Sequence, residues 1–408
     1  MTLVQSLLFL LPASLVLALE KITFFGFPIY SLELIFLFFV GVSLWQINKG
    51  EDRLLLKNLD RWLALGAGLF VGGALLSLLT HPFTTTTLGQ FKSWFLFPAA
   101  TFITLYILRG GEYKERLQVY AAWLVGVGVI VLAALYGYSQ DIVTYDQRLA
   151  FPYSSANFLA YLLVPGVLLG AFFLSRSKEA QKRNILIGIF GTMLFVVYLT
   201  HSYTVWLALI ITLPLLMYVL ALSNHKYLSK LIIQLCIVMT LLCMLIWLEQ
   251  GNTKWQNLFL NDGRSSLDSR LMIWHSASAI IKDHWFLGIG VGNFQKEYLA
   301  YQIQFPTYLE WAVPQPHNIL LATWLQTGLL GLLGAGLLLG RTFFLLIQKI
   351  YRNKNKEIHN EGFLLLSLWG AFFIYGLFDT PYFRNDLAFI FWLQILLTSW
   401  YVKGKITN

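Results

Sequence analysis

Two arginines and a histidine mark the part of this chain where chemistry is most expected. Arg264 and Arg270 lie within residues 249–316, the one long polar stretch of an otherwise apolar sequence, and His317 follows directly, where a long apolar run begins. A guanidinium can bind phosphate oxygens through two parallel hydrogen bonds, which an ammonium cannot do. A neutral imidazole can accept a proton from a hydroxyl. Cations and a base gathered at one membrane face would suit an anionic, lipid-linked substrate.

His317 lies where the sequence favours a neutral imidazole. Pro316 disfavours helix at Gln315, so a helix should begin at or just after His317, with His317 or Asn318 near its cap. The partial positive charge of a helix N-terminus disfavours the imidazolium form, which leaves an imidazole able to accept a proton. The competing interpretation is that His317 only caps this helix at a wet interface.

The residues around Arg270 predict an amphipathic helix. Serines and Asp268 precede an apolar periodicity, which is typical of a capped helix start, and the helix should run to about Trp285. Its apolar stripe would lie in the bilayer interface, with Arg270 at the border of that stripe. In this place Arg270 could bind phosphate, or it could only reach lipid headgroups as a snorkelling cation. The stripe consists of Leu267, Leu271, Trp274, Ile281 and Trp285.

The glycine-rich stretch from Gly288 to Phe294 has the look of a phosphate loop. A dinucleotide fingerprint requires a preceding strand and a helix within a βαβ unit, and the sequence supplies neither. A tight turn that returns the backbone toward the membrane is the favoured interpretation.

Other polar residues accompany this region. Arg148 lies in a short outer loop before an apolar run, and residues 379–384 form the last outer turn. Lys92 and Glu33 are charges set against apolar runs, where ionisable residues are often functional.

The elements that must position these residues are membrane-spanning helices. The chain is 57% hydrophobic and 12% charged, with a mean hydropathy of +0.65, so it is an integral membrane protein. Because a span takes about 20 apolar residues, about twelve transmembrane helices are predicted. They lie near residues 3–19, 29–46, 62–80, 91–108, 117–137, 156–174, 185–200, 204–222, 231–248, 318–347, 363–378 and 386–402.

The predicted fold is all-α and polytopic, with one large extracytoplasmic loop that contains amphipathic helices. Most of the 29 Lys and Arg residues fall in alternate loops, so the positive-inside rule places both termini in the cytoplasm and residues 249–316 outside it. The chain then divides into residues 1–248 with spans 1–9, a catalytic loop at 249–316, and residues 317–408 with spans 10–12. The net charge of +9 reflects this topology and not nucleic-acid binding. No Cys or His spacing suggests a metal site or a cofactor.

Four ordered motifs resemble the O-antigen ligase and polymerase superfamily of membrane glycosyltransferases. They are residues 148–157 with LAYLL at 159–163, SRLMIWHSA at 269–277, WFLGIGVGNF at 285–294, and PHNILLATWLQTGLLGLL at 316–333. The resemblance implies a metal-independent enzyme of the bacterial cytoplasmic membrane. Such an enzyme transfers a glycan from an undecaprenyl-diphosphate carrier to a hydroxyl of a glycan, lipid or protein acceptor at the outer face. It also implies that Arg270 binds the diphosphate and that His317 is the base or positions the acceptor.

The remaining predicted site residues follow from the same resemblance. Arg148 and Arg264 would bind phosphate, whereas Asn157, Asn293 and Asn318 would shape the site. The family usually has Ser-Arg at the outer end of the span pair near residue 200, where this chain has Ser202-Tyr203, so Tyr203 takes the place of that arginine and His201, Arg148 or Arg264 could substitute for it. A ligase, a polymerase and, from another class, a transporter or flippase of lipid-linked glycans or small anions remain open alternatives.

Overall fold

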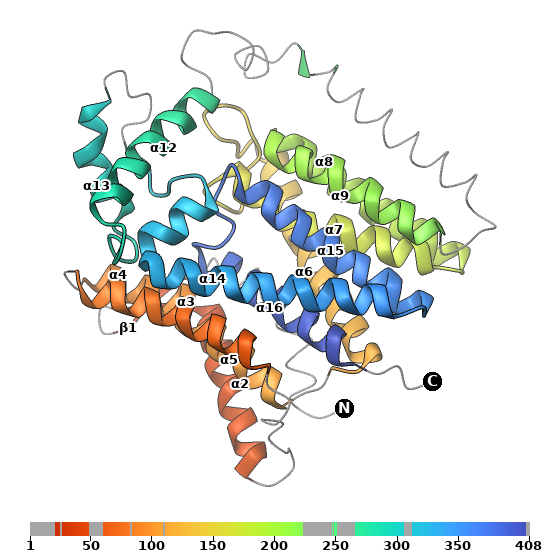
Figure 1. Ribbon diagram of the computed structural model, residues 1–408. Helices are drawn as coiled ribbons and strands as arrows, with labels where there is room; N and C mark the ends of the chain where they lie inside the picture. The colour runs from red at the N-terminus through yellow and green to blue at the C-terminus, as the bar shows by residue number, and fades with distance from the viewer. Residues whose placement is uncertain are drawn as a thin grey trace.

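The computed structural model describes residues 21–24, 27–48, 60–81, 84–108, 111–222, 247, 249–250, 266–305 and 312–404. Arg264 lies outside these residues, as does the predicted span at 3–19 and nearly all of the one at 231–248. The described chain is predominantly helical, as predicted (Figure 1).

The described chain is built from a series of helices. They are α2 (Ser31–Asn48), α3 (Arg61–Leu79), α4 (Thr85–Phe91), the π-helix η3 (Lys92–Leu96), α5 (Phe97–Leu108), α6 (Tyr113–Ser139), α7 (Ala156–Arg176), α8 (Ala180–Leu199), α9 (Tyr203–Leu222), α12 (Ser266–Asp283), α13 (Phe294–Tyr301), the 3₁₀ helix η5 (Gln302–Gln304), α14 (Ile319–Arg352), α15 (Lys356–Gly376) and α16 (Asn385–Lys403). A small antiparallel hairpin, which the sequence did not predict, pairs β1 (Lys21–Phe24) with β2 (Phe27–Tyr30).

Six of the described helices are long and apolar enough to cross a membrane: α3, α6, α7, α8, α9 and α14. Their bounds agree with the predicted spans to within a few residues at most ends. Helices α2, α5, α15 and α16 also lie where spans were predicted. The total of twelve spans stays a prediction.

Helix α14 is the longest helix described, and it is broken at Gly328, where the sequence suggested an uninterrupted run. Gly328 has φ 64° and ψ −172°, which removes local helical hydrogen bonds. The glycine-rich loop replaces them: Ile289 donates its N–H to the Leu325 carbonyl at 2.7 Å, and Leu329 donates to the Phe286 carbonyl at 3.0 Å. Backbone groups freed inside a membrane need such partners. The loop is therefore docked against the break.

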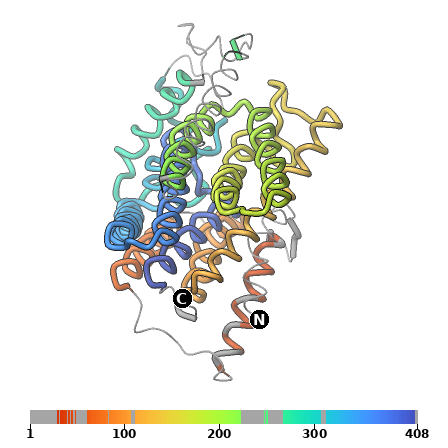
Figure 2. The backbone as a smooth tube through the Cα atoms, turned by 90° about the vertical axis from the view of Figure 1, so that its right-hand side faces the viewer, coloured from red at the N-terminus to blue at the C-terminus, as the bar shows by residue number. Residues whose placement is uncertain are grey.

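Helices α3 and α14 lie side by side, as both views show (Figures 1 and 2). Their contact is made by small residues: a Cβ added to Gly73 would come within 2.3 Å of the Gly331 nitrogen, and one added to Gly334 within 2.3 Å of the Phe70 nitrogen. Small residues let helix backbones approach closely, which is how helices associate in lipid by van der Waals packing.

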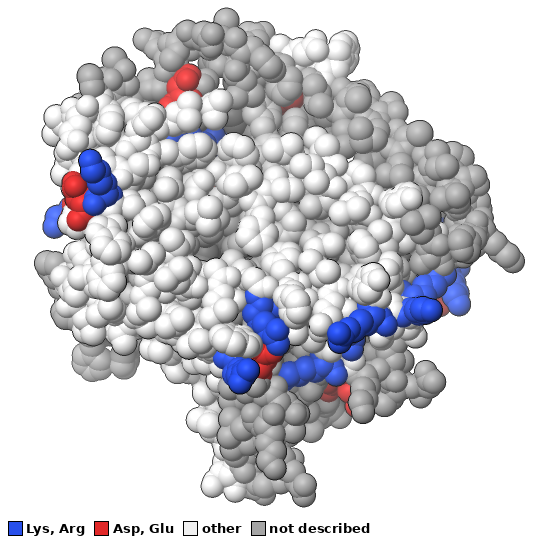
Figure 3. Space-filling view, viewed as in Figure 1, with Lys and Arg blue, Asp and Glu red and all other residues white. Residues whose placement is uncertain are grey.

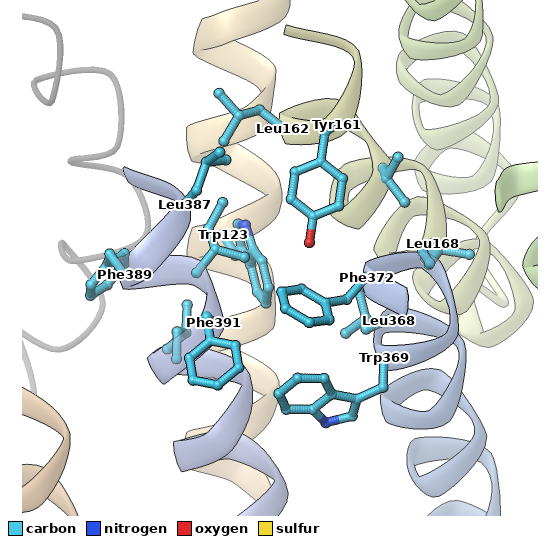
Figure 4. Packing of buried hydrophobic residues seen from close by; sticks show 14 of the residues in the cluster. Trp123, Tyr161, Leu162, Leu168, Leu368, Trp369, Phe372, Leu387, Phe389 and Phe391 are labelled. Atoms are coloured by element: carbon cyan, nitrogen blue, oxygen red, sulfur yellow. The ribbon is translucent and has the colours of Figure 1, made fainter. Parts of the chain in front are cut away.

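An aromatic core joins α6, α7, α15 and α16 (Figure 4). Trp123, Tyr161, Trp369 and Phe391 are buried in it, and the rings of Trp369 and Phe391 meet edge to face with centroids 5.7 Å apart. This core contacts the second half of α15, and the turn that follows this helix belongs to the candidate site.

Charged residues are confined to the ends of the bundle. On the face drawn in Figure 3, Lys and Arg form a band over the end of α14 and the start of α3, and a broad uncharged surface separates that band from the charges near α13. The last turn of α14 contributes Lys349 and Arg352 to this end of the molecule. The orientation of this band toward the cytoplasm is a prediction from the positive-inside rule.

Candidate active site

The imidazole of His317 is held by a buried carboxylate. Asn318 is the N-cap of α14, so His317 immediately precedes that cap, in agreement with the predicted helix start. The Nδ1 atom of His317 lies 3.1 Å from Oδ1 of Asp379, which belongs to the turn between α15 and α16. The histidine side chain is 31% exposed and the aspartate side chain 3% exposed. A carboxylate accepts hydrogen bonds, so Nδ1 carries the hydrogen and the neutral ring keeps its lone pair on Nε2.

Asp379 is ionised because several donors surround it. The Tyr375 hydroxyl donates to Oδ2 at 2.9 Å, the Asn157 amide donates to Oδ2 at 3.3 Å, and the Thr380 N–H donates to Oδ1 at 2.9 Å. Burial by itself raises the pKa of Asp379, but His317, Arg270 and these donors outweigh it and lower the pKa below its ordinary value. The Asp379 side chain next to the imidazole of His317 is therefore negatively charged.

Arg148 reaches this network through Asn157. Its guanidinium donates to the side-chain oxygen Oδ1 of Asn157 at 3.1 Å and to Oδ2 of Asp146 at 2.7 Å. Asn157 lies in the first turn of α7, so the outer loop that carries Arg148 is connected to Asp379 by one side chain. The structure therefore brings Arg148, Asn157 and His317, three predicted residues, into one hydrogen-bonded chain.

Arg270 approaches the same turn from α12. Its Nε donates to the Phe378 carbonyl at 2.9 Å, next to Asp379, whose pKa it helps to lower. Helix α12 ends at Asp283, slightly before the predicted end, and buries Ile273, Ala277 and Ile280. Leu267 and Leu271 of the predicted stripe are exposed, which leaves that side of the helix available to lipid.

The side chains of two predicted asparagines form hydrogen bonds with backbone groups. Asn318 accepts the N–H groups of Leu320 and Leu321 and donates to the Leu377 carbonyl at 3.1 Å, so it both caps α14 and ties it to the turn that follows α15. Asn293 donates to the Ile289 carbonyl at 2.8 Å within the glycine-rich loop. Neither side chain belongs to the His317–Asp379 network among the contacts described.

The glycine-rich loop donates its N–H groups to residues of α3 and α14. Gly290 donates to the Ser77 hydroxyl at 3.0 Å, and Gly292 donates to the Gln326 side chain at 3.1 Å. Both glycines have positive φ, as a tight turn requires. This geometry is that of the predicted turn and not of a phosphate cradle.

His201 and Tyr203 share a second buried carboxylate. His201 Nδ1 lies 2.6 Å from Oε1 of Glu249, and the Tyr203 hydroxyl donates to Oε2 of Glu249 at 3.0 Å. The loop of Arg148 adjoins this group, because Leu149 donates to the Leu199 carbonyl at 3.0 Å. Arg148 is therefore connected to His317 through Asn157 and Asp379, and its loop contacts the residues just before His201.

Three supporting residues were not singled out from the sequence. Tyr375 and Glu249 carried no motif, and Asp379 was named only as the first residue of the last outer turn. The one available signal was a lone acidic or phenolic group at the end of an apolar run. Among the described residues, no group of three or more His, Cys, Asp and Glu side chains could hold a metal ion.

Comparison with known proteins identifies the domain that contains much of this site. Residues 188–336 match the family model described as O-antigen ligase, and no curated protein matches the chain. The matched segment includes His201, Tyr203, Arg270 and His317, whereas Arg148, Asn157 and Asp379 lie outside it. The match agrees with the family that the motifs suggested. Residues 188–336 thus form an O-antigen ligase domain, within a helical chain in which six of the described helices are long and apolar enough to cross a membrane.

Proposed function

We propose that the protein transfers a glycan from undecaprenyl diphosphate to an acceptor hydroxyl at the outer face of the bacterial inner membrane. The observation that carries this proposal is the His317–Asp379 pair, flanked by Arg148 and Arg270. A base and two guanidiniums are the groups that such a transfer requires.

The reaction follows from the roles of these groups. The acceptor oxygen attacks C1 of the first sugar of the donor, and the bond between C1 and the phosphate oxygen breaks, with its electron pair passing to the diphosphate. Nε2 of His317 takes the proton of the acceptor hydroxyl, and Asp379 stabilises the imidazolium that forms. Arg148 and Arg270 stabilise the charge that develops on the leaving diphosphate.

Ligase and polymerase chemistry use the same donor and the same groups, and they differ only in the acceptor. A finished glycan passed to a lipid or protein makes the protein a ligase, whereas a growing glycan as acceptor makes it a polymerase. The ligase reaction is the one proposed here, because the matched family is described as O-antigen ligase.

Purified protein in lipid nanodiscs tests the reaction directly. The donor is the undecaprenyl-diphosphate-linked glycan extracted from the native host, and mass spectrometry follows bare undecaprenyl diphosphate and the glycosylated acceptor. The wild type should release bare carrier in step with product, and Arg270→Ala and His317→Asn should not. Lys296→Ala, on α13, is the matched control for loss of a cation from the same end of the molecule. A protein that binds the donor but leaves the glycosidic bond intact would be a transporter, and the proposal would then be rejected.

A further inference from the structure

The pair His201–Glu249 resembles the pair His317–Asp379 in placing a histidine beside a buried carboxylate. In both pairs the histidine presents Nδ1 to a carboxylate whose side chain is at most 3% exposed. Both histidines have left-handed φ values, 45° and 49°, which few non-glycine residues adopt and which occur often at functional sites. Each histidine lies just before a helix, α9 or α14. His201 is thus placed against Glu249 by an ion-pair contact of 2.6 Å, whereas His317 is hydrogen-bonded to Asp379.

The charges around His201 are unsuited to a phosphate. Glu249 is buried and accepts from the Tyr203 hydroxyl as well as facing His201. With a neutral imidazole the group of three side chains has a net charge of −1, and with an imidazolium it has no net charge. Phosphate sites need an excess of positive charge. Arg148, which acts electrostatically on Tyr203, is the neighbouring cation.

Aromatic rings surround the same pair. The centroid of the His201 ring lies 5.4 Å from that of Tyr198, which stacks on Trp206 at 5.8 Å with an interplanar angle of 18°. Tyr203 meets Trp206 edge to face at 5.5 Å. Hydrogen-bonding groups placed beside aromatic faces match a sugar ring, which has hydroxyls on its rim and apolar C–H faces.

We propose that His201, Glu249 and Tyr203 form a saccharide subsite that binds uncharged sugar hydroxyls, in place of a further phosphate-binding cation. The sugar belongs either to the donor glycan or to the acceptor, and its chemistry is the same in both. The inference rests on the proposed function, since it assigns this corner of the same site to the glycan. His201 then acts as a hydrogen-bonding group oriented by Glu249, with Tyr198 and Arg148 as the other titratable or charged groups that face the cluster.

Two ligands that differ only in the sugar separate a saccharide site from a phosphate site. Binding of bare undecaprenyl diphosphate and of the host's glycan-linked undecaprenyl diphosphate is measured by native mass spectrometry on protein in nanodiscs, and the KM for acceptor is measured in the transfer assay. The variants are Tyr203→Phe and Glu249→Gln. The matched control is Tyr218→Phe, an exposed tyrosine on the same helix.

Loss of one hydrogen bond should weaken sugar binding about 3- to 10-fold. If the affinity for glycan-linked carrier falls and that for bare carrier is unchanged, the subsite holds the donor sugar. If both carriers bind as in the wild type and the acceptor KM rises, it holds the acceptor sugar. Equal weakening of both carriers, or no effect on any of the three quantities, overturns the inference.

A third variant tests the charge argument. Tyr203→Arg restores a cation beside Glu249, and at a saccharide subsite it should weaken glycan-dependent binding without strengthening the bare carrier. Tighter binding of bare undecaprenyl diphosphate would instead identify a phosphate site. Thermal unfolding of each variant separates loss of binding from loss of fold. A wild type that binds both carriers but does not transfer the glycan would contradict the proposed function, while the two binding arms would still test this inference.

Discussion

At the scale of single residues, the site depends on a carboxylate that the protein keeps buried and charged. An isolated buried carboxylate is strongly unfavourable, and Asp379 is stable only because His317, Tyr375, Asn157 and the Thr380 N–H all donate to it or face it. The same donors connect α7, α14 and α15. The groups that orient the base therefore also hold together the helix ends that form the site.

Asp379→Asn should lower kcat by two to four orders of magnitude, on the order of 10²–10⁴-fold. An amide can donate to Nδ1 of His317, and this would stabilise the tautomer whose hydrogen is on Nε2, which cannot act as the base. The arginines that are proposed to bind the donor are unchanged, so KM for the donor should change much less. The measurement is steady-state transfer in nanodiscs.

The control for this variant is Asp283→Asn, which removes a carboxylate that accepts from Tyr301 on the α12–α13 side of the molecule. Its kcat should stay within about twofold of the wild type, since surface substitutions cost little. Equal losses in the two variants would contradict a specific role for Asp379.

The pH dependence of stability tests the charge of Asp379. Burial by itself raises the pKa of Asp379. His317, Arg270 and the hydrogen bonds have a larger effect in the opposite direction and bring this pKa below its ordinary value of 3.8. A carboxyl group with a lowered pKa stabilises the fold at pH values above its unfolded pKa, and this contribution is lost as the pH falls through the folded pKa. The difference in Tm between the wild type and Asp379→Asn should therefore be constant from about pH 5 to 8 and should shrink below pH 3.8. A difference that vanished between pH 5 and 7 would indicate a raised pKa.

The sequence singled out the candidate residues of the site but not the residues that contact them. His317 and Arg270 were named because a base at a helix start and a guanidinium at a helix border suit an anionic substrate, although capping and lipid-headgroup contact would use the same residue types. Asp379 is separated from His317 by 62 positions, and Glu249 is separated from His201 by 48 positions. Such pairs follow from helix packing, which periodicity within one segment does not encode.

At the scale of elements, the break in α14 explains why the glycine-rich loop is where it is. The sequence predicted a turn at residues 288–294 and a helix from about 318, and both are present. It could not predict that Gly328 would open the helix, because an apolar run with several glycines reads as one continuous span. The exchange of hydrogen bonds between Ile289, Leu325, Phe286 and Leu329 needs both segments in contact.

The contact between α3 and α14 gives a matched pair of glycine substitutions. Gly334→Ala places a methyl group 2.3 Å from the Phe70 nitrogen, and the helices must separate to admit it, at a cost of about 1–3 kcal/mol. Gly336→Ala, on the same helix, meets nothing within 4 Å and should be neutral or stabilise the protein by about 0.4–1 kcal/mol. Thermal unfolding of both variants in detergent compares them. Equal Tm values would mean that the helix contact contributes little.

At the scale of the whole molecule, the charged side chains described around the site and around Arg116 lie at opposite ends of a bundle with an aromatic core between them. The sequence predicted the helices and the side of each charged loop from apolar length and the distribution of Lys and Arg. The pairing of charges across the bundle was not readable. Helix α15 shows the consequence: Tyr375 near one end supports the candidate site, and Glu361, fourteen residues away and so about 21 Å along the helix, pairs with Arg116 at the opposite end.

At the end opposite the site, the fold should be sensitive to the loss of either partner of the buried Arg116–Glu361 pair. Arg116 Nε and Nη2 donate to the two oxygens of Glu361 at 2.6 and 2.8 Å, Tyr120 donates to the same carboxylate at 3.0 Å, and both charged side chains are at most 2% exposed. Glu361→Gln leaves a buried guanidinium without its counter-charge and should cost about 3–5 kcal/mol. Replacing both partners with apolar residues, as in Arg116→Met with Glu361→Leu, should recover most of that loss, because no uncompensated charge remains.

Thermal unfolding of the single and double variants measures this, and the donor KM of the folded fraction should stay at the wild-type value because the site lies at the other end of α15. A single variant that unfolds like the wild type would mean that the buried pair is energetically neutral, and α15 would then be held by its aromatic packing alone.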